Sequence, residues 1–530
     1  MIKNYLKTAI RTLFRNRLHT MINMVGLALG ITCSLVLFLL ADHALSYDDF
    51  QENKERIYRI VHSARGQGGE IDYTPGVPIP LPDAIREDFP EFEKVVLTSD
   101  LHDDKLFTIN PDADQPQHFE LTQKRLVYTE PQYFDIFTTQ WIAGNKATAL
   151  SQPNSIVLTQ TIADMLFPDK DALGAVILFN KDYQLKVTGV IKDLPETTDM
   201  PFDMYVSLET IREEIKESGW NSISSNDQCY VLLAGKDNPD TYKSRLASFE
   251  KKYFGEGSDN PKTFELQPMS DLHFNEHWSN YSYNTISSDQ ITLMHVVAIF
   301  LLVTACINFI NLSTAVAVKR SREVGVRKVL GGTKKQLIFQ FMAESFGIVL
   351  ISLIVALGLA ELMLIYLNPF LEVELSIELT DIGFLAQLAL GTVLITILSG
   401  FYPALVLSRF QPALALKNLI NYKHSGGVSL RKGLVIFQFF ISQFFIIGTI
   451  ITISQMHFLK SADLGYTSEA LINLRIPEND NQKKKTLKNE LNRIAGVEKV
   501  SLQFSNPSSG SVSVSNFTFE DNPEDFYTSM

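Results

Sequence analysis

The chain has 530 residues, of which 45% are hydrophobic, and its formal net charge is -12 at pH 7. A mean hydropathy of +0.05 is high for a soluble protein and indicates a membrane protein. Two of the three cysteines, Cys33 and Cys306, lie in apolar runs, and Cys229 stands alone outside them. The cysteines therefore predict neither a disulfide framework nor a zinc site.

Five long segments are almost free of charged side chains. At about 1.5 Å rise per residue, twenty-odd helical residues cross the ~30 Å hydrocarbon core of a bilayer. The first uncharged run, 18–41, has 24 residues. It exceeds the roughly 7–15 apolar residues of a signal peptide, so we interpret it as a retained anchor. The predicted spans are residues 19–42, 290–318, 336–367, 382–408 and 433–459.

Two acidic residues interrupt the third span. Glu344 and Glu361 bracket a charge-free stretch of 16 residues. Because a charge at the centre of a bilayer is costly, we expect them near opposite membrane boundaries or facing the interior of the helix bundle. Boundary carboxylates are the favoured interpretation, and a substrate or ion site is the alternative.

Basic residues gather in three segments beside the spans, namely 1–18, 319–335 and 409–432. Together they hold seventeen basic residues and one acidic residue, a net charge of +16, so the remainder carries -28. The positive-inside rule places all three segments, and the N-terminus, in the cytoplasm. The acidity then belongs to the exterior part, which argues against a nucleic-acid partner.

The N-terminal segment, 1–18, has a regular pattern of its own. Apolar and basic residues each recur at helical spacing, which predicts an amphipathic helix lying along the inner headgroups. Basic residues that only set the topology are the alternative, although they leave the apolar stripe unexplained. The apolar positions are Ile2, Leu6, Ala9 and Leu13, and the basic ones are Lys3, Lys7, Arg11 and Arg15.

Residues 43–288 are long enough for a large extracytoplasmic domain, and their pattern is mixed α/β. Residues 175–195 contain two β-rich runs joined by Asn-Lys-Asp, which predicts a hairpin. Residues 154–168 predict a strand that enters a helix, 238–254 a surface helix, and 228–235 a buried strand. The predicted fold class is therefore a multi-pass α-helical membrane protein of five spans with a large α/β extracytoplasmic domain.

The run HFNEH, His273 to His277, fits the H-x-x-E-H pattern of zinc proteases, in which Glu276 would activate water. Its flanks are rich in Pro, Ser, Asp and Asn, a composition typical of turns that would not hold the required helix. We therefore expect two solvated loop histidines and no metal site.

The basic segment 319–335 is predicted to be a firm helical turn between paired membrane helices. Glu323 precedes Arg327 by four residues, the favourable order for a helical ion pair. Gly331 and Gly332 can end that helix, and Thr333 with a Gln three residues later predicts a capping box for the next one. Membrane topology alone would explain the charge, but it requires no such shape.

Two extended stretches resemble a known family. SREVGVRKVLGGTKKQLIFQFMAES and LSGFYPALVLSRFQPALALK resemble the FtsX-like permease domain of ABC transporter membrane subunits, the class that includes MacB and the LolC/LolE lipoprotein extractors. Residues 19–255 resemble the MacB-like periplasmic core domain, chiefly through VYTEPQYFDIFTTQWIAGNKATALSQPNSIVLTQTIADMLFP.

A weak internal repeat agrees with this resemblance. Residues 430–476 parallel the start of the chain in having basic residues, one span, and then LGY and LRI where the first copy has LSY and YRI. The order fits the eight-span members of the family, with 460–530 as the start of a second, incomplete extracytoplasmic domain. We therefore expect the chain to be a fragment or a truncated member.

The resemblance implies a permease subunit that couples ATP hydrolysis by a separate ATPase to movement of its exterior domain, for export or for lipoprotein or peptide extrusion. The chain contains no G-x-x-x-x-G-K-[ST] motif, so ATP and Mg are expected in the partner, and no cofactor in this chain. Alternatives are a signal relay that controls an envelope protein and a sensor without an ATPase. The expected coupling surface comprises Arg322, Glu323, Val326, Arg327, Lys328, Val329 and Leu330.

Further expectations concern the fourth span and the surroundings of the chain. Gly400 and Pro403 predict a kink, with a motion-transmitting hinge as the functional alternative. The expected location is the inner membrane, with membrane lipid and an ABC ATPase as partners and, under the signal-relay alternative, an envelope protein. The family implies a homodimer or a pseudo-dimer of repeats.

Overall fold

The computed structural model describes residues 17–65, 70–101, 105–109, 116–121, 123–168, 170–235, 238–255, 262–409, 427–463, 471–474, 476, 480–503, 514–519 and 522–529. For 19, 317–322, 409, 427–430 and the last two ranges, only the backbone is described. The chain divides into two compact units: residues 1–102, 106–119 and 123–452 form one, and residues 103–105, 120–122 and 453–530 form the other.

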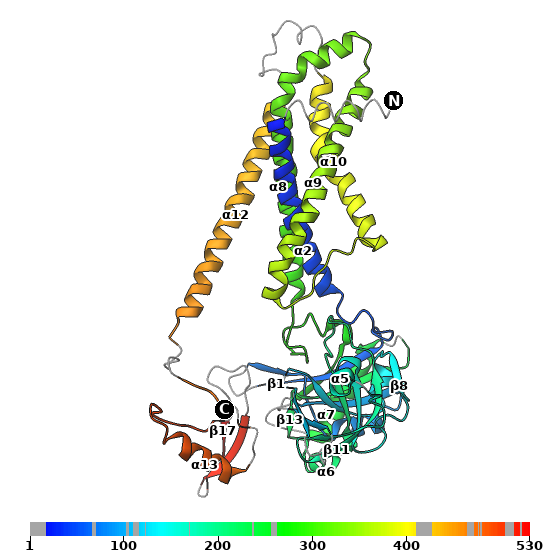
Figure 1. Ribbon diagram of the computed structural model, residues 1–530, viewed down its shortest axis with the longest axis vertical. Coiled ribbons are helices and arrows are strands. Elements are labelled where there is room, and N and C mark those ends of the chain that lie inside the picture. The colour runs from blue at the N-terminus through cyan, green and yellow to red at the C-terminus, as the bar shows by residue number, and fades with distance from the viewer. Residues whose placement is uncertain are drawn as a thin grey trace. The chain divides into compact units, whose positions relative to one another are not determined.

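Within these described residues, five helices are long and apolar enough to cross a membrane (Figure 1). The first, third and fourth agree closely with the predicted spans, whereas the second continues as a helix through most of the segment 319–335. The helices are α2 (Arg17–Leu45), α8 (Ser288–Val329), α9 (Lys334–Leu371), α10 (Ile382–Arg409) and α12 (Gly427–Ser461).

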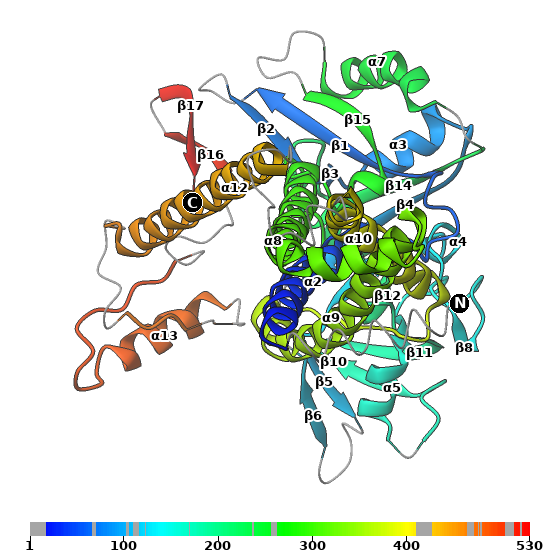
Figure 2. The ribbon, with the colours of Figure 1, turned by 90° about the horizontal axis from the view of Figure 1, so that it is seen from above.

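Helices α2, α8, α9 and α10 pack against one another, as the view from above shows (Figure 2). Small residues allow the close approach, since a Cβ added to Gly30 would lie 2.5 Å from Cβ of Ala305. Hydroxyl groups also cross between helices: Ser34 donates to the Ala298 carbonyl at 2.7 Å, and Ser352 donates to the Met24 carbonyl at 3.3 Å. Such contacts hold helices together where lipid supplies no hydrophobic driving force.

The fifth helix, α12, differs from the other four in its burial. In the span 431–461 only 6% of the residues of its most apolar window are buried, against 22–39% for the other spans. Its described contacts with the bundle include the Phe445 ring, whose centroid lies 6.4 Å from that of Phe300. Among the side chains described for residues 431–461, only that of Ile441 is buried. The apolar surface of α12 is thus mostly open to lipid or to further protein.

The extracytoplasmic domain is built on a sheet of thirteen strands in the order β15-β1-β14-β4-β7-β12-β9-β11-β10-β5-β6, with β2 paired to β1 and β8 to β11. The pairs β7–β12 and β9–β11 are parallel, whereas β1–β2, β1–β14, β1–β15, β4–β7, β4–β14, β5–β10, β8–β11, β9–β12 and β10–β11 are antiparallel. The strands are β1 (Ile57–Arg65), β2 (Ile71–Thr74), β4 (Phe92–Leu101), β5 (Leu106–Ile109), β6 (Gln117–Glu120), β7 (Leu126–Thr129), β8 (Trp141–Gly144), β9 (Ser155–Thr159), β10 (Val176–Phe179), β11 (Tyr183–Ile191), β12 (Met204–Ser207), β14 (Asp227–Leu233) and β15 (Lys262–Pro268).

Short helices and one small additional sheet complete the domain. The short strands β3 (Val77–Pro78) and β13 (Ile223–Ser224) pair with each other. The helices are α3 (Leu81–Asp88), α4 (Tyr133–Ile136), α5 (Gln160–Leu166), α6 (Arg212–Ile215) and α7 (Lys243–Phe254), with 3-10 turns η1 (Leu208–Thr210), η2 (Pro239–Tyr242) and η3 (Met269–Asp271). The mixed α/β domain and the membrane helices together confirm the predicted fold class.

The local predictions for this domain are confirmed. Strands β10 and β11 form the predicted hairpin, and its turn residues Asn180 and Lys181 have φ of 48° and 68°. Positive φ at both central positions is typical of the turn that matches the twist of paired strands. Strand β9 leads directly into α5, and β14 is a buried strand between β1 and β4.

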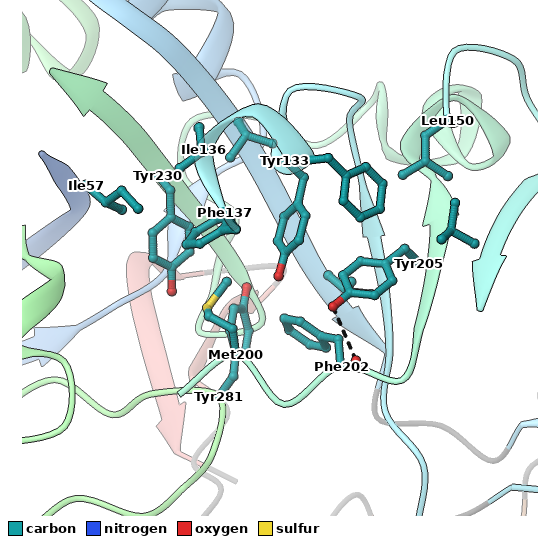
Figure 3. Close-up of a cluster of buried hydrophobic side chains, with 14 of the residues drawn as sticks. Ile57, Tyr133, Ile136, Phe137, Leu150, Met200, Phe202, Tyr205, Tyr230 and Tyr281 are labelled. Carbon is teal, nitrogen blue, oxygen red and sulfur yellow. Dashed lines mark hydrogen bonds between the residues drawn. The ribbon is translucent and has the colours of Figure 1, made fainter. Parts of the chain in front are cut away.

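The core of the domain is rich in aromatic side chains (Figure 3). Tyr133 contacts both Phe137 and Tyr205, with ring centroids 4.6 and 5.1 Å apart, and Phe202 meets Tyr281 edge to face at 4.9 Å. Aromatic pairs in such arrangements contribute about 0.5–1.5 kcal/mol each beyond their buried area. This cluster forms the buried core of the domain.

The second unit contains α13 (Asn481–Leu491) and a hairpin of β16 (Val514–Phe519) and β17 (Asn522–Ser529). Asp480 caps α13 by accepting from the backbone amides of Gln482 and Lys483. The amphipathic helix predicted over 1–18 lies outside the described residues except for its last two positions, which begin α2.

Candidate coupling surface

The turn between α8 and α9 has the local structure that its sequence predicts. Gly331 has φ of +94°, a conformation that favours glycine, and the Gly332 amide donates to the Arg327 carbonyl at 2.9 Å. Thr333 and Gln336 form a complete capping box at the start of α9. Both helix ends therefore satisfy backbone groups locally, and the turn is short and firm.

Three apolar residues of the predicted surface are exposed at the end of α8. The exposed fractions are 45% for Val326, 65% for Val329 and 80% for Leu330. Val329 and Leu330 follow Val326 by three and four residues, so all three lie on one face of the helix end. Lys334 and Lys335, at the start of α9, are also exposed. The turn thus presents an apolar patch with basic neighbours, and we call Val326, Val329 and Leu330 the apolar tip.

The charged pair predicted for the same surface has a different orientation. Arg327 and Glu323 form the expected ion pair at 2.7 Å, but their side chains are only 32% and 36% exposed. Arg327 also donates to Oε1 of Gln340 at 2.6 Å, and Gln340 donates to the buried Glu344 at 3.3 Å. This chain of contacts runs from α8 into α9, so the pair holds the turn in place as well as carrying charge.

Lys328 has a similar role on the other side. Its Nζ atom donates to the Ser408 carbonyl at 2.7 Å, near the C-terminal end of α10. A lysine suits this position because the last carbonyls of a helix lack backbone donors and carry partial negative charge. Beneath it, an apolar cluster joins the three helices and consists of Val324, Leu337, Phe341, Ala404 and Leu407. Arg322 lies within α8, where only the backbone is described.

The two acidic residues of the third span occupy different surroundings. Glu344 is 7% exposed and faces the bundle interior, whereas Glu361 is exposed. The structure therefore favours an interior position for Glu344 over the boundary interpretation. Gln340, the hydrogen-bond partner of Glu344, was not identified from the sequence, because a glutamine in an amphipathic helix has no distinctive spacing.

Gly400 and Pro403 lie inside α10, which continues through both. A Cβ added to Gly400 would lie 2.7 Å from Oγ of Ser345 on α9, so glycine here permits close packing of two helices. This close contact explains why glycine suits position 400. The predicted hinge stays a prediction.

The HFNEH segment forms turns and no helix. The expectation of two solvated histidines is wrong for His273, which is 3% exposed and lies 3.2 Å from Oδ1 of Asp199. His277 is exposed, as expected. Across the described ranges, no group of three or more His, Cys, Asp or Glu side chains is arranged to hold a metal ion.

Comparison with known families gives two matches. The model of the MacB-like periplasmic core domain matches residues 20–249, and that of the FtsX-like permease C-terminal domain matches residues 295–412. The matched residues include most of the extracytoplasmic domain, the apolar tip and most of the four packed helices, and they leave out residues 250–294.

Curated relatives agree with these matches. The macrolide export ATP-binding/permease proteins MacB of Bdellovibrio bacteriovorus and Neisseria meningitidis are each 24% identical, over 49% and 54% of this chain. The chain spans about two-fifths of their length, 38% and 42%. An uncharacterized ABC transporter permease of Bacillus subtilis, YvrN, is 20% identical over 78% of this chain and 99% of its own.

Two solved structures are similar to 41% of the chain. One is a domain of a putative permease from Porphyromonas gingivalis, 20% identical, with a TM-score of 0.35 over 91% of that structure. The other is the periplasmic region of MacB from Actinobacillus actinomycetemcomitans, 15% identical, with a TM-score of 0.29 over 90% of that structure.

Proposed function

The chain belongs to the family of ABC transporter permeases that combine a MacB-like periplasmic core domain with an FtsX-like permease domain, and on that premise we propose that it couples ATP hydrolysis by a separate ATPase subunit to movement of its exterior domain. The movement would serve export or extrusion of a peptide, lipoprotein or small molecule. The observation that carries the proposal is the exposed apolar tip on a firmly capped turn.

The composition of the tip suits a protein partner. Interfaces have an apolar centre and a polar rim, and Val326, Val329 and Leu330 with the exposed lysines nearby supply both. Positive charge at the rim favours a partner with acidic groups around an apolar groove. Such a partner would meet the turn from the cytoplasm, the side on which the positive-inside rule places residues 319–335 and the N-terminus.

The contacts behind the tip would transmit a push into the bundle. Arg327 binds α9 through Gln340, and Lys328 binds the end of α10. A force on Leu330 would therefore act on α8, α9 and α10 together and would not simply bend the turn between α8 and α9. Helices α2 and α8 lead directly into the extracytoplasmic domain, which would carry the movement outside.

Purification of the full chain from its native membranes tests this proposal. We expect an ATP-hydrolysing subunit to co-purify with the native protein and to be lost from Leu330→Asp, because a charge at the centre of an apolar contact opposes docking. Leu379→Asp is the matched control, since Leu379 is 55% exposed in the loop between α9 and α10. Equal ATPase activity with Leu330→Asp and the native chain would contradict the assignment of the tip.

A further inference from the structure

A buried polar cluster joins the membrane helices to the extracytoplasmic domain. It includes three segments: the turn 46–50 that follows α2, the loop 196–203 before β12, and the segment 272–286 that leads into α8. Each contributes a titratable side chain, namely Asp48, Asp199 and His273. None of these side chains is used by the proposed coupling surface.

Asp48 ties the end of α2 to the loop. Its φ is +57°, and its backbone amide donates to the Thr197 carbonyl at 2.9 Å. Its carboxylate accepts from Oγ1 of Thr198 at 2.6 Å and from the Asp199 amide at 3.2 Å. Only 1% of the surface of Asp48 is exposed, so these hydrogen bonds replace the contacts with water that its carboxylate loses on burial.

Asp199 ties the same loop to the segment before α8. Its Oδ1 accepts from Asn280 at 2.8 Å and from Ser282 at 2.9 Å, and it lies 3.2 Å from Nδ1 of His273. Its Oδ2 is buried and has no hydrogen-bond partner in the described part of the chain. A carboxylate that is 1% exposed with one oxygen unsatisfied is a costly arrangement.

Aromatic and apolar contacts close the junction. The Tyr47 ring stacks on His273 with centroids 3.5 Å apart, and Asn284 donates to the Tyr47 hydroxyl at 3.4 Å. Beside them, one apolar cluster contains residues from both helix ends and from the connecting segment: Ala41, Ala44, Phe274, Ile286 and Ile291. The ends of α2 and α8 are therefore fixed to the domain at one place.

The negative charges of the Asp48 and Asp199 carboxylates also repel each other. Burial, and then the charge of Asp199, raise the pKa of Asp48 to about 7. Lys54 is the nearby cation that favours ionisation of Asp48, but its Nζ is bonded to Asp49 and to the Tyr47 carbonyl. The other titratable groups around the pair are His43, Tyr47, Arg59, Tyr133, Glu196 and Tyr230.

We propose that Asp48, Asp199 and His273 form a proton-sensitive latch, which fixes the ends of α2 and α8 to the extracytoplasmic domain when Asp48 is protonated and loosens when both carboxylates are ionised. The proton is exchanged with water on the exterior side, and no bond other than O–H forms or breaks. A protonated Asp48 removes the repulsion and can donate to Thr198 while still accepting from the Asp199 amide. The latch needs no ATP and no partner, so it goes beyond the proposed function.

Hydrogen exchange of the full chain in lipid nanodiscs tests the latch. Amide exchange in 196–203 and 272–286 is measured between pH 5.5 and pH 8 and corrected for the pH dependence of the chemical exchange step. The protection factors of these amides are expected to fall by at least about tenfold as the pH rises through 7. The closed junction holds the Asp48 proton more tightly than the open one, so loss of that proton favours opening. The core strand β14 should keep its protection.

Asp48→Asn is the principal variant. The asparagine amide can donate to Thr198 and its carbonyl can accept from the Asp199 amide, so it mimics protonated Asp48. We expect high protection at both pH values. Asp199→Asn removes the opposing charge and should move the midpoint to lower pH. Glu213→Gln is the control, since Glu213 is 86% exposed on α6, where it pairs with Lys216, and its change should leave the midpoint unchanged.

Each outcome decides for or against the latch. A pH-independent junction in the native chain would overturn it, and so would an unchanged transition in Asp48→Asn, which would assign the titration to a group other than Asp48. If Asp48→Asn does not fold, the midpoint of Asp199→Asn decides, because an unchanged midpoint contradicts the coupling of the two carboxylates. The measurement involves no ATPase, so it succeeds or fails independently of the coupling surface.

Discussion

Nη1 of Arg327 on α8 donates to Oε1 of Gln340 on α9 at 2.6 Å, across the turn that carries the apolar tip. The two residues are 13 positions apart in sequence but face each other because the capped turn reverses the chain. Gln340 is 7% exposed and also donates to Glu344. Because the Gln340 side chain is buried, water cannot replace Arg327 as its hydrogen-bond partner if this contact is lost.

Gln340→Leu should destabilise the bundle by about 1–3 kcal/mol, since it removes the acceptor of Arg327 and a donor to the buried Glu344. The denaturation midpoint of the full chain in nanodiscs measures this. Gln387→Leu is the control, because Gln387 lies exposed on α10. Similar midpoints for both variants would show that the Gln340 contacts carry no stability.

Gly400→Ala should cost about 1–3 kcal/mol, because the new Cβ would lie 2.7 Å from Oγ and 2.8 Å from Cβ of Ser345. Adding Ser345→Gly should restore most of the loss, which thermal denaturation of the double variant measures. Gly391→Ala is the control, since no atom of the described residues lies within 4 Å of its added Cβ. A neutral Gly400→Ala would argue against close packing of α9 and α10 at this position.

Thr333→Ala should destabilise the start of α9 by about 1 kcal/mol, because it removes the side chain that caps the Gln336 amide. Hydrogen exchange in the first turn of α9 should rise correspondingly. Thr333→Ser keeps the hydroxyl and should behave as the native chain. Faster exchange in the serine variant than in the alanine variant would rule out the cap as the cause.

The stability of the chain should depend on pH through Asp48. Burial raises its folded-state pKa to about 7, above the ordinary aspartate value of 3.8, so the folded state holds a proton that the unfolded state releases more easily. The stabilisation is complete below about pH 4 and is lost as pH rises through 7, with an upper bound of roughly 4 kcal/mol. Denaturation midpoints at pH 5 and pH 8 measure the change, and Asp48→Asn should reduce the difference. An identical difference in the variant would contradict the assignment.

Local features of the fold could be predicted from sequence. The capping box at Thr333, the ion pair between Glu323 and Arg327, and the hairpin turn at Asn180 depend on residues within four positions of each other. The membrane spans were predictable for a similar reason, since length and hydropathy are properties of one segment. The residues of the apolar tip were proposed from the family resemblance of the segment that contains them, and their exposure is a feature of the fold.

Features that depend on distant residues could not be predicted. His273 is buried because Tyr47 stacks on it, and the two are brought together only by the folded domain. The inward orientation of Arg327 depends on Gln340, whose role the sequence does not signal. The strand order, with its crossovers between β14, β4 and β7, is likewise set by long-range pairing that no local pattern specifies.

The central claim is that the apolar tip faces the cytoplasm, on the membrane side opposite the extracytoplasmic domain. A single cysteine at Leu330→Cys, in a chain with Cys33, Cys229 and Cys306 replaced by alanine, can be tested with a membrane-impermeant maleimide on spheroplasts. Labelling is predicted only after permeabilisation, whereas Leu379→Cys in the α9–α10 loop should label in intact spheroplasts. Labelling of Leu330→Cys before permeabilisation would contradict the account.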